Sequence, residues 1–213
     1  MTASLWCAES VSMTRVYEDV VVLDVAQDRY ECLVDAASWL DPQPDGGLRV
    51  QDELLADQMI EAGLASLEPP SARETLPPPD RALAPGAPAN RLAIIRAGLV
   101  LAAATATFHN RRFADLTKPR RESPPAAAVA DEDTVQAVVA AARAAAPFIP
   151  FEGECLHRAY VLRRLLEHQG IGANWVFGVR TWPFAAHCWL QIGSLVVGDT
   201  LDRVRHYSPI RIV

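Results

Sequence analysis

The chain has 213 residues, half of them hydrophobic, and a formal net charge of −6. Its length allows one large domain or two small ones, and its apolar content is sufficient for a packed core. Basic residues are scattered, with no run longer than Arg111-Arg112 and Lys118-Pro-Arg-Arg121. An acidic chain without a basic block argues against nucleic acid as the main partner.

Cysteine usage and the first ten residues suggest a compartment. The four cysteines include no CxxC pair, and MTASLWCAES lacks a basic region followed by an apolar run. We therefore expect a reduced, cytoplasmic protein without structural disulfides. The cysteines are Cys7, Cys32, Cys155 and Cys188.

The first 68 residues are expected to form a small β-meander followed by helices. Val20–Val25 and Tyr30–Val34 are β-rich runs on either side of a turn-like segment, and Met13–Tyr17 could add a third strand. Apolar spacing predicts helices over Ala36–Leu40 and Gln51–Ala62, the second ending at a glycine. The sequence therefore indicates a first domain over residues 1–68.

Prolines divide the rest of the chain. Residues 69–88 hold seven of the 16 prolines, so residues 69–90 are expected to be an extended linker. A second proline-marked break is expected at Pro119–Pro125. The apolar window Leu92–Phe108 is shorter than the ~20 residues that span a bilayer and contains Arg96, so we expect a largely buried helix and no membrane span.

Residues 91–213 are expected to form a second domain in which helices precede an antiparallel sheet, an α+β arrangement. Helices are expected at Arg91–Phe113, Asp131–Ala146 and Cys155–Gln169, the last ending at Gly170. The expected strands are Asn174–Arg180, His187–Ile192, Leu195–Val197 and Ile210–Val213.

Cys155, His187 and Asp199 are candidates for a nucleophile, its base and the residue that orients the base. They follow one another at intervals of 32 and 12 residues, so that the cysteine begins a helix and the other two lie on or after later strands. A helix N-terminus and a nearby imidazolium both lower a thiol's pKa, and the thiolate is the attacking form. The sequence offers both devices for Cys155.

Other interpretations compete with this one. Each of the three residues alone is most simply structural, and Asp202 is a rival to Asp199 as the orienting residue. Zinc bound by Cys155, His157, His187 and Cys188 is disfavoured, because residues two apart on a helix diverge and neighbouring strand residues face opposite sides. For the same reason Cys188 is expected to point away from Cys155 and to pack in the core, whereas Trp189 shares the face of His187.

The last part of the chain contains a series of short motifs. They are Cys155-Leu-x-Arg158, Leu165-Leu166, Gly170, Gly178-Val179, Pro183-Phe184, Ala186-His187-x-Trp189 and Gly198-Asp199. By these motifs, residues from about 145 to 213 resemble the transglutaminase-like cysteine peptidase of lasso-peptide biosynthesis, the B protein of such gene clusters. A thiol at position 188 departs from the family pattern, where a small residue without a thiol is expected.

Residues 1–68 are similar, more loosely, to the precursor-recognition domain of ribosomal peptide maturation systems. That domain is winged-helix-like and related to the small peptide chaperone of pyrroloquinoline quinone biosynthesis. The resemblance thus implies a recognition domain at 1–68, a linker at 69–90 and a transglutaminase-like or papain-like peptidase at 91–213, with the nucleophilic cysteine on a helix packed against an antiparallel sheet.

The resemblance also implies an activity. The protein would bind the leader of a precursor peptide and hydrolyse the bond between leader and core, with Cys155 as nucleophile, His187 as base and later acid, and Asp199 as orienting residue. A partner cyclase similar to asparagine synthetase would then close a macrolactam. No Walker-type or glycine-rich phosphate loop is found in the sequence, so we expect no bound cofactor and any ATP dependence to come through the cyclase. No metal is expected either, since the zinc ligand set is disfavoured by its geometry.

Two alternatives remain open: acyl transfer to an amine by the same three residues, and a non-catalytic scaffold that presents the precursor. The strand Tyr30–Val34 is the candidate leader groove, because an extended peptide can add to a free strand edge. Tyr30 and Cys32 would share one face of it, and Glu31 and Leu33 the other. The alternative is that this edge is covered by the peptidase domain.

Overall fold

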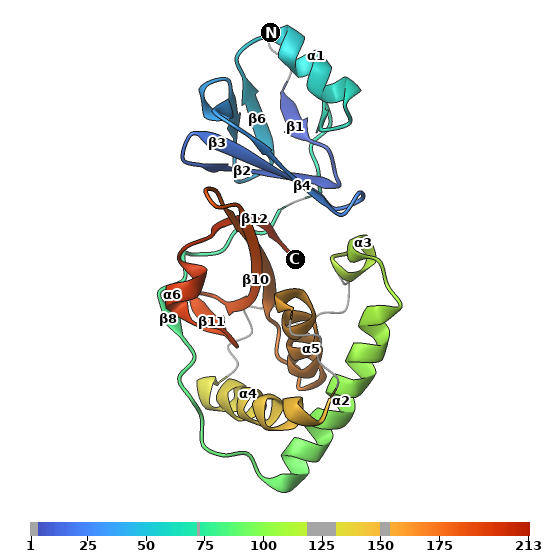
Figure 1. The fold of residues 1–213 in the computed structure, drawn as a ribbon, viewed down its shortest axis with the longest axis vertical. Coiled ribbons are helices and arrows are strands. Elements are labelled where there is room, and N and C mark those ends of the chain that lie inside the picture. The colour runs from blue at the N-terminus through green and yellow to red at the C-terminus, as the bar shows by residue number, and fades with distance from the viewer. Residues whose placement is uncertain (1–3, 72, 119–130, 150–153) are drawn as a thin grey trace. The chain divides into compact units, whose positions relative to one another are not determined.

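Figure 1 presents the computed structural model, which describes residues 4–71, 73–118, 131–149 and 154–213. Contacts divide the chain into two compact units. The first comprises residues 1–75, 177–186 and 207–212, and the second comprises 76–176, 187–206 and 213. The proline-marked break expected at 119–125 lies outside the described residues.

One sheet of the first unit combines four short strands in the order β5-β6-β1-β7. These are β1 (Leu5–Cys7), β5 (Leu40–Pro42), β6 (Gly47–Val50) and β7 (Ala65–Ser66), and the neighbours are antiparallel. Helix α1 (Glu53–Glu61) packs mainly against β6 and β7. The sequence did not predict this sheet, because strands of two to four residues leave no periodic signal.

The second sheet of this unit is an antiparallel meander, β2-β3-β4. Its strands are β2 (Val11–Val16), β3 (Asp19–Asp24) and β4 (Arg29–Leu33). Every residue of β3 is buried, which explains its run of valines and leucine on both faces. The meander agrees with the sequence-based expectation. Strand β4 is at the edge of the sheet, with β3 as its neighbour.

The helices expected in this unit differ from those found. Residues Ala36–Ser38 form a single 3-10 turn, not a helix to Leu40, and the second expected helix is α1. Asp52 caps α1, because its Oδ1 accepts a hydrogen bond from the N–H of Leu55 at 2.8 Å. The winged-helix-like arrangement stays a prediction.

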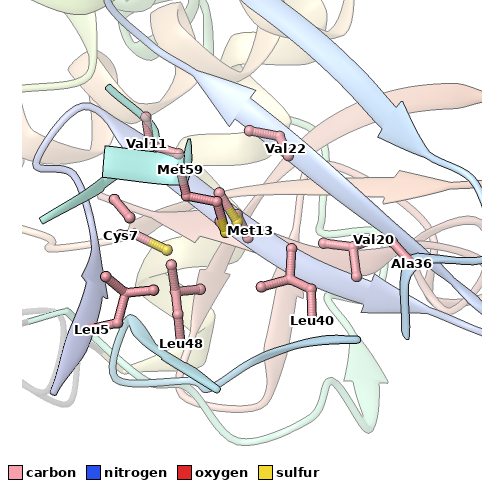
Figure 2. Packing of buried hydrophobic residues seen from close by; sticks show 11 residues of the cluster. Leu5, Cys7, Val11, Met13, Val20, Val22, Ala36, Leu40, Leu48 and Met59 are labelled. Atoms are coloured by element: carbon pink, nitrogen blue, oxygen red, sulfur yellow. The ribbon is translucent and has the colours of Figure 1, made fainter. Parts of the chain in front are cut away.

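The core of the first unit lies among these strands and α1. Met13 from β2 and Met59 from α1 belong to one cluster of apolar side chains, together with valines of β3 (Figure 2). Flexible thioethers fill irregular gaps, which suits a core lined by short strands. The buried members are Leu5, Cys7, Val11, Met13, Val20, Val22, Ala36, Leu40, Leu48, Met59 and Ala65.

Three helices dominate the second unit: α2 (Arg91–His109), α4 (Glu132–Ala145) and α5 (Cys155–His168). Each packs against the other two (Figure 1). Helix α2 stops at His109, earlier than expected, and the four-residue α3 (Phe113–Leu116) follows after a break. The helix expected over 91–113 is therefore two helices.

Helix α2 is buried on one face only. Ala97, Leu101, Ala104 and Thr105 are buried, whereas Leu92, Ile95 and Leu99 are 56%, 61% and 68% exposed. The expectation of a largely buried helix is therefore wrong, because α4 and α5 cover a single side. By length and composition alone, α2 is the one helix in the described part of the chain that could cross a membrane.

A five-stranded sheet has the order β12-β9-β10-β11-β8. Its strands are β8 (Arg81–Ala82), β9 (Asn174–Arg180), β10 (Ala185–Ile192), β11 (Leu195–Val197) and β12 (Ser208–Ile212). β10 and β11 are antiparallel, and β8 runs parallel to β11. Part of the expected linker is thus a sheet strand. The bounds 1–68, 69–90 and 91–213 stay a prediction.

A last short helix, α6 (Leu201–Val204), follows β11 and was not predicted from the sequence. Thr200 caps it, because the Thr200 side chain accepts a hydrogen bond from the N–H of Arg203 at 3.4 Å. Four residues cannot produce a helical hydrophobic period. This helix matters because it begins two residues after Asp199.

Candidate active site

Cys155 is the first residue of α5 and is half-buried. Glu154 precedes it in extended conformation, so the helix begins at the cysteine. The first N–H groups of a helix have no partner within the helix, and the dipole places positive charge at this end. This position stabilises a thiolate on Cys155.

His187 and Asp199 form a hydrogen-bonded pair. His187 Nε2 lies 2.6 Å from Asp199 Oδ2, and their side chains are 9% and 13% exposed. His187 comes from β10, and Asp199 follows β11. Asp199 Oδ1 accepts the N–H of Thr200 at 2.7 Å, which fixes the carboxylate. Because Asp199 engages Nε2, Nδ1 is the imidazole nitrogen available to a thiol.

Gly198 is the residue that allows Asp199 this position. It has φ of +78°, a conformation that residues with a Cβ rarely adopt. A Cβ at this position would also lie 2.5 Å from Leu162 Cδ2 of α5. The chain therefore turns closely past α5 just before the carboxylate.

The pKa of the Cys155 thiol is lowered to about 4. The largest cause is a hydrogen bond with the Cys188 side chain, followed by one with His187; burial opposes both. The backbone of Cys188 also hydrogen-bonds to the sulfur. Cys155 is therefore a thiolate at neutral pH.

The pKa of His187 is raised to about 9. Burial alone would lower it, but the hydrogen bonds with Asp199 and Cys155 and the charges of both outweigh burial. The pKa of Asp199 is lowered: burial opposes this, and the hydrogen bond to His187 outweighs it. Between about pH 4 and about pH 9 the site therefore holds a thiolate, an imidazolium and a carboxylate.

Cys188 lies against Cys155, so the expectation that it points away is wrong. Its side chain hydrogen-bonds to that of Cys155, and this bond together with burial raises the pKa of the Cys188 thiol. Alternation along a strand fixes the direction of Cβ, but the N-terminus of α5 approaches β10 closely enough for Cys155 to contact both neighbouring residues. Trp189 stacks beside His187, with ring centroids 6.3 Å apart.

A cavity of about 140 Å³ adjoins these residues. Its wall is mainly apolar, and all of its lining residues belong to the second unit. The three candidate catalytic residues line it together with Cys188 and Trp189. Three arginines, Arg143, Arg158 and Arg203, line it too. Arg158 belongs to the motif Cys155-Leu-x-Arg158, whereas no pattern in the sequence distinguished Arg143 and Arg203 from other arginines.

The other candidates from the sequence lie elsewhere. Asp202 is exposed on α6, and the carboxylate that lies 2.6 Å from His187 Nε2 is that of Asp199. His157 is buried in α5, where Nε2 and Thr105 Oγ1 of α2 are 3.0 Å apart. In the described part of the chain, no group of three or more metal-binding side chains is placed to hold an ion.

The candidate leader groove is strand β4 with Val34 beyond it. Tyr30, Glu31, Cys32 and Leu33 are partly buried, and Val34 is exposed. The Tyr30 ring lies 6.0 Å from that of Phe184, and Leu33 packs against the core of the first unit. Helix α1 was expected beside this strand, but packs mainly on β6 and β7. The groove stays a prediction.

Two comparisons with known proteins find a match. Residues 98–212 match the model of the transglutaminase-like superfamily. A stretch of 49 residues is 43% identical to the Microcin J25-processing protein McjB of Escherichia coli; it covers 23% of this chain and 24% of that protein. The match thus spans about a quarter of the relative's length. No solved structure matches.

Proposed function

Because this chain belongs to the transglutaminase-like superfamily, we propose that it is a cysteine peptidase that removes the leader from a lasso-peptide precursor. The relative's name, a processing protein for Microcin J25, supports this substrate class. The observation that carries the proposal is the contact of Cys155 with His187, and of His187 with Asp199, beside one cavity. These three residues suit covalent catalysis through an acyl-enzyme intermediate.

Acylation would begin with attack by the Cys155 thiolate on the carbonyl carbon of the leader–core bond. The imidazolium of His187 would give its proton to the departing amine, which becomes the free N-terminus of the core. The leader would then be held on Cys155 as a thioester. Asp199 would keep the imidazole ring in place and favour its charged form.

Deacylation would need water. His187, now neutral, would take a proton from a water molecule that attacks the thioester, and the leader would leave with a new carboxylate. The backbone N–H of Cys155, at the start of α5, is the candidate donor to the oxyanion. Cys155 as nucleophile and His187 as acid and then base would thus hydrolyse the bond in two steps, acylation and deacylation.

Leader recognition would fall to strand β4. An edge strand presents unpaired backbone groups, and an extended peptide can pair with them while its side chains are read by neighbouring pockets. β4 has one strand neighbour in the described sheet, β3. We assign the leader to the segment Tyr30, Glu31, Cys32, Leu33 and Val34.

The proposal also includes a partner cyclase, its ATP requirement and the compartment of the reaction. A macrolactam cyclase similar to asparagine synthetase would use the freed amine, and an ATP requirement would arise from that cyclase. The reaction would take place in the cytoplasm, where a reactive thiolate stays reduced. No cofactor is needed for the steps above.

Mass spectrometry of a cognate precursor tests this function. The precursor is incubated with the wild type and with His187→Ala, with and without cyclase and ATP, and with and without added hydroxylamine. Hydrolysis predicts one cut that yields a leader carboxylate, slowed in the variant. A leader hydroxamate formed without competing hydrolysis would favour acyl transfer, and an intact precursor in every tube would favour a scaffold.

A further inference from the structure

The cavity beside Cys155 is bordered by three arginines from three helices. Arg143 lies in the last turn of α4, Arg158 lies one turn after Cys155 on α5, and Arg203 lies on α6. Asp199 is the one carboxylate among the described lining residues. The whole chain has a net charge of −6, so the cluster of arginines beside Cys155 is a local feature.

Two of these arginines pair with no acidic side chain among the described residues. Arg203 lies 3.7 Å from Asp199, but neither Arg143 nor Arg158 forms an ion pair with any residue that the structure describes. Elsewhere in the same unit, Arg81 pairs with Glu132 and Arg164 with Glu167. Arg143 and Arg158 are therefore available to an anion that enters the cavity.

The size and walls of the cavity limit what that anion can be. At about 140 Å³, it is smaller than the roughly 300 to 1,000 Å³ typical of sites for drug-sized ligands. It is large enough for one amino-acid side chain. Apolar residues, among them Leu101, Val139, Leu162 and Leu190, form the rest of the wall and would contact the methylene groups of that side chain.

We propose that this cavity is a subsite for an acidic side chain of the precursor, close to the bond that Cys155 attacks. Arg143 and Arg158 would bind its carboxylate, because a guanidinium presents paired N–H donors that match the two carboxylate oxygens. The same charges disfavour lysine or arginine at that position of the precursor. The assignment rests on the proposed function for its substrate, but the charge of the cavity can be tested without it.

Alkylation of Cys155 provides that independent test. Iodoacetate and iodoacetamide undergo the same reaction, in which the thiolate displaces iodide, and differ in one carboxylate. The second-order rate constants of both are measured at pH 7 for the wild type, Arg143→Gln and Arg158→Gln, with the modified residue identified by peptide mapping. Arg96→Gln is the control, because Arg96 is an exposed arginine on α2 that does not line the cavity.

The informative quantity is the ratio of the iodoacetate rate to the iodoacetamide rate. A general change in the nucleophilicity of Cys155 alters both rates and cancels in the ratio. Loss of a charge-assisted contact should lower the ratio roughly tenfold in each cavity variant and leave it unchanged in Arg96→Gln. Equal ratios in all four proteins would overturn the anionic subsite, whether or not any precursor is cleaved.

The substrate side is tested with precursor pairs. Each residue near the cut is replaced in turn by Glu and by Gln, and kcat/KM is compared within each pair. We expect one position at which Glu is preferred roughly tenfold by the wild type and not by Arg143→Gln or Arg158→Gln. If the precursor is cleaved but no position shows this preference, the proposed subsite is wrong and the proposed peptidase function is retained. If no precursor is cleaved, the alkylation ratios still decide the subsite.

Discussion

His187 Nε2 and Asp199 Oδ2 are 2.6 Å apart, although the two residues come from a strand and from the turn after the next strand. This hydrogen bond raises the pKa of His187 against the effect of burial. Because Asp199 engages Nε2, the hydrogen bond between His187 and the Cys155 thiol falls to Nδ1. The pair therefore fixes both the charge and the orientation of the imidazole.

Asp199→Asn should weaken both effects. The pKa of His187 should fall from about 9 toward the ordinary histidine value, and kcat should fall roughly 10²- to 10⁴-fold. NMR titration of His187 and steady-state cleavage of the precursor measure the two changes. Asp202→Asn is the matched control, and a larger loss in that variant would make Asp202 the orienting residue.

The pH dependence of kcat/KM should be bell-shaped. Below about pH 4 the Cys155 thiolate is protonated and cannot attack, so activity falls with falling pH. Above about pH 9 His187 loses the proton that the leaving amine needs, so activity falls with rising pH. A profile that rises through the ordinary thiol range would show that the ion pair is absent in the free protein.

Cys188→Ala should make Cys155 less acidic. The Cys188 side chain is the largest cause of the low pKa of Cys155, so its removal should move the midpoint of iodoacetamide alkylation upward by on the order of one pH unit. Cys32→Ala, which removes a thiol of the first unit, should leave the midpoint where it is. An unchanged midpoint in Cys188→Ala would mean that His187 alone sets the thiol's pKa.

Proline substitutions in β4 test the leader groove. Of two consecutive strand residues, one directs its N–H to the neighbouring strand and the other directs it outward. Among Glu31→Pro and Cys32→Pro, one variant should therefore keep its melting temperature and bind the leader roughly tenfold more weakly, because an outward N–H is lost. Fluorescence anisotropy of a labelled leader measures this. Unchanged affinity in the thermally stable variant would place the leader elsewhere.

Long elements with a regular pattern were predictable from the sequence. The strand Asn174–Arg180 is found with the expected bounds, and α5 ends one residue before the expected end. Short elements were not predictable, because their stability comes from distant partners. Strand β8, for example, has two residues and exists through pairing with β11 more than 100 residues later.

The candidate site was also predictable from the sequence only in part. Residue type and order led to the expectation that Cys155, His187 and Asp199 would meet, and the structure brings them to one cavity. The roles of Cys188 and of the arginines depend on how closely α5 approaches β10 and on which side chains of α4 and α6 reach the cavity. Tertiary packing determines both, and no local pattern records it.

The central claim is that Cys155 carries the leader as a thioester. Acid-quenched time points of the wild type and Cys155→Ala with the same precursor can be analysed by mass spectrometry of the intact proteins and of their proteolytic peptides. The account predicts a leader adduct on the peptide containing Cys155 and no leader release by the variant. Release of leader by Cys155→Ala at the wild-type rate would contradict it.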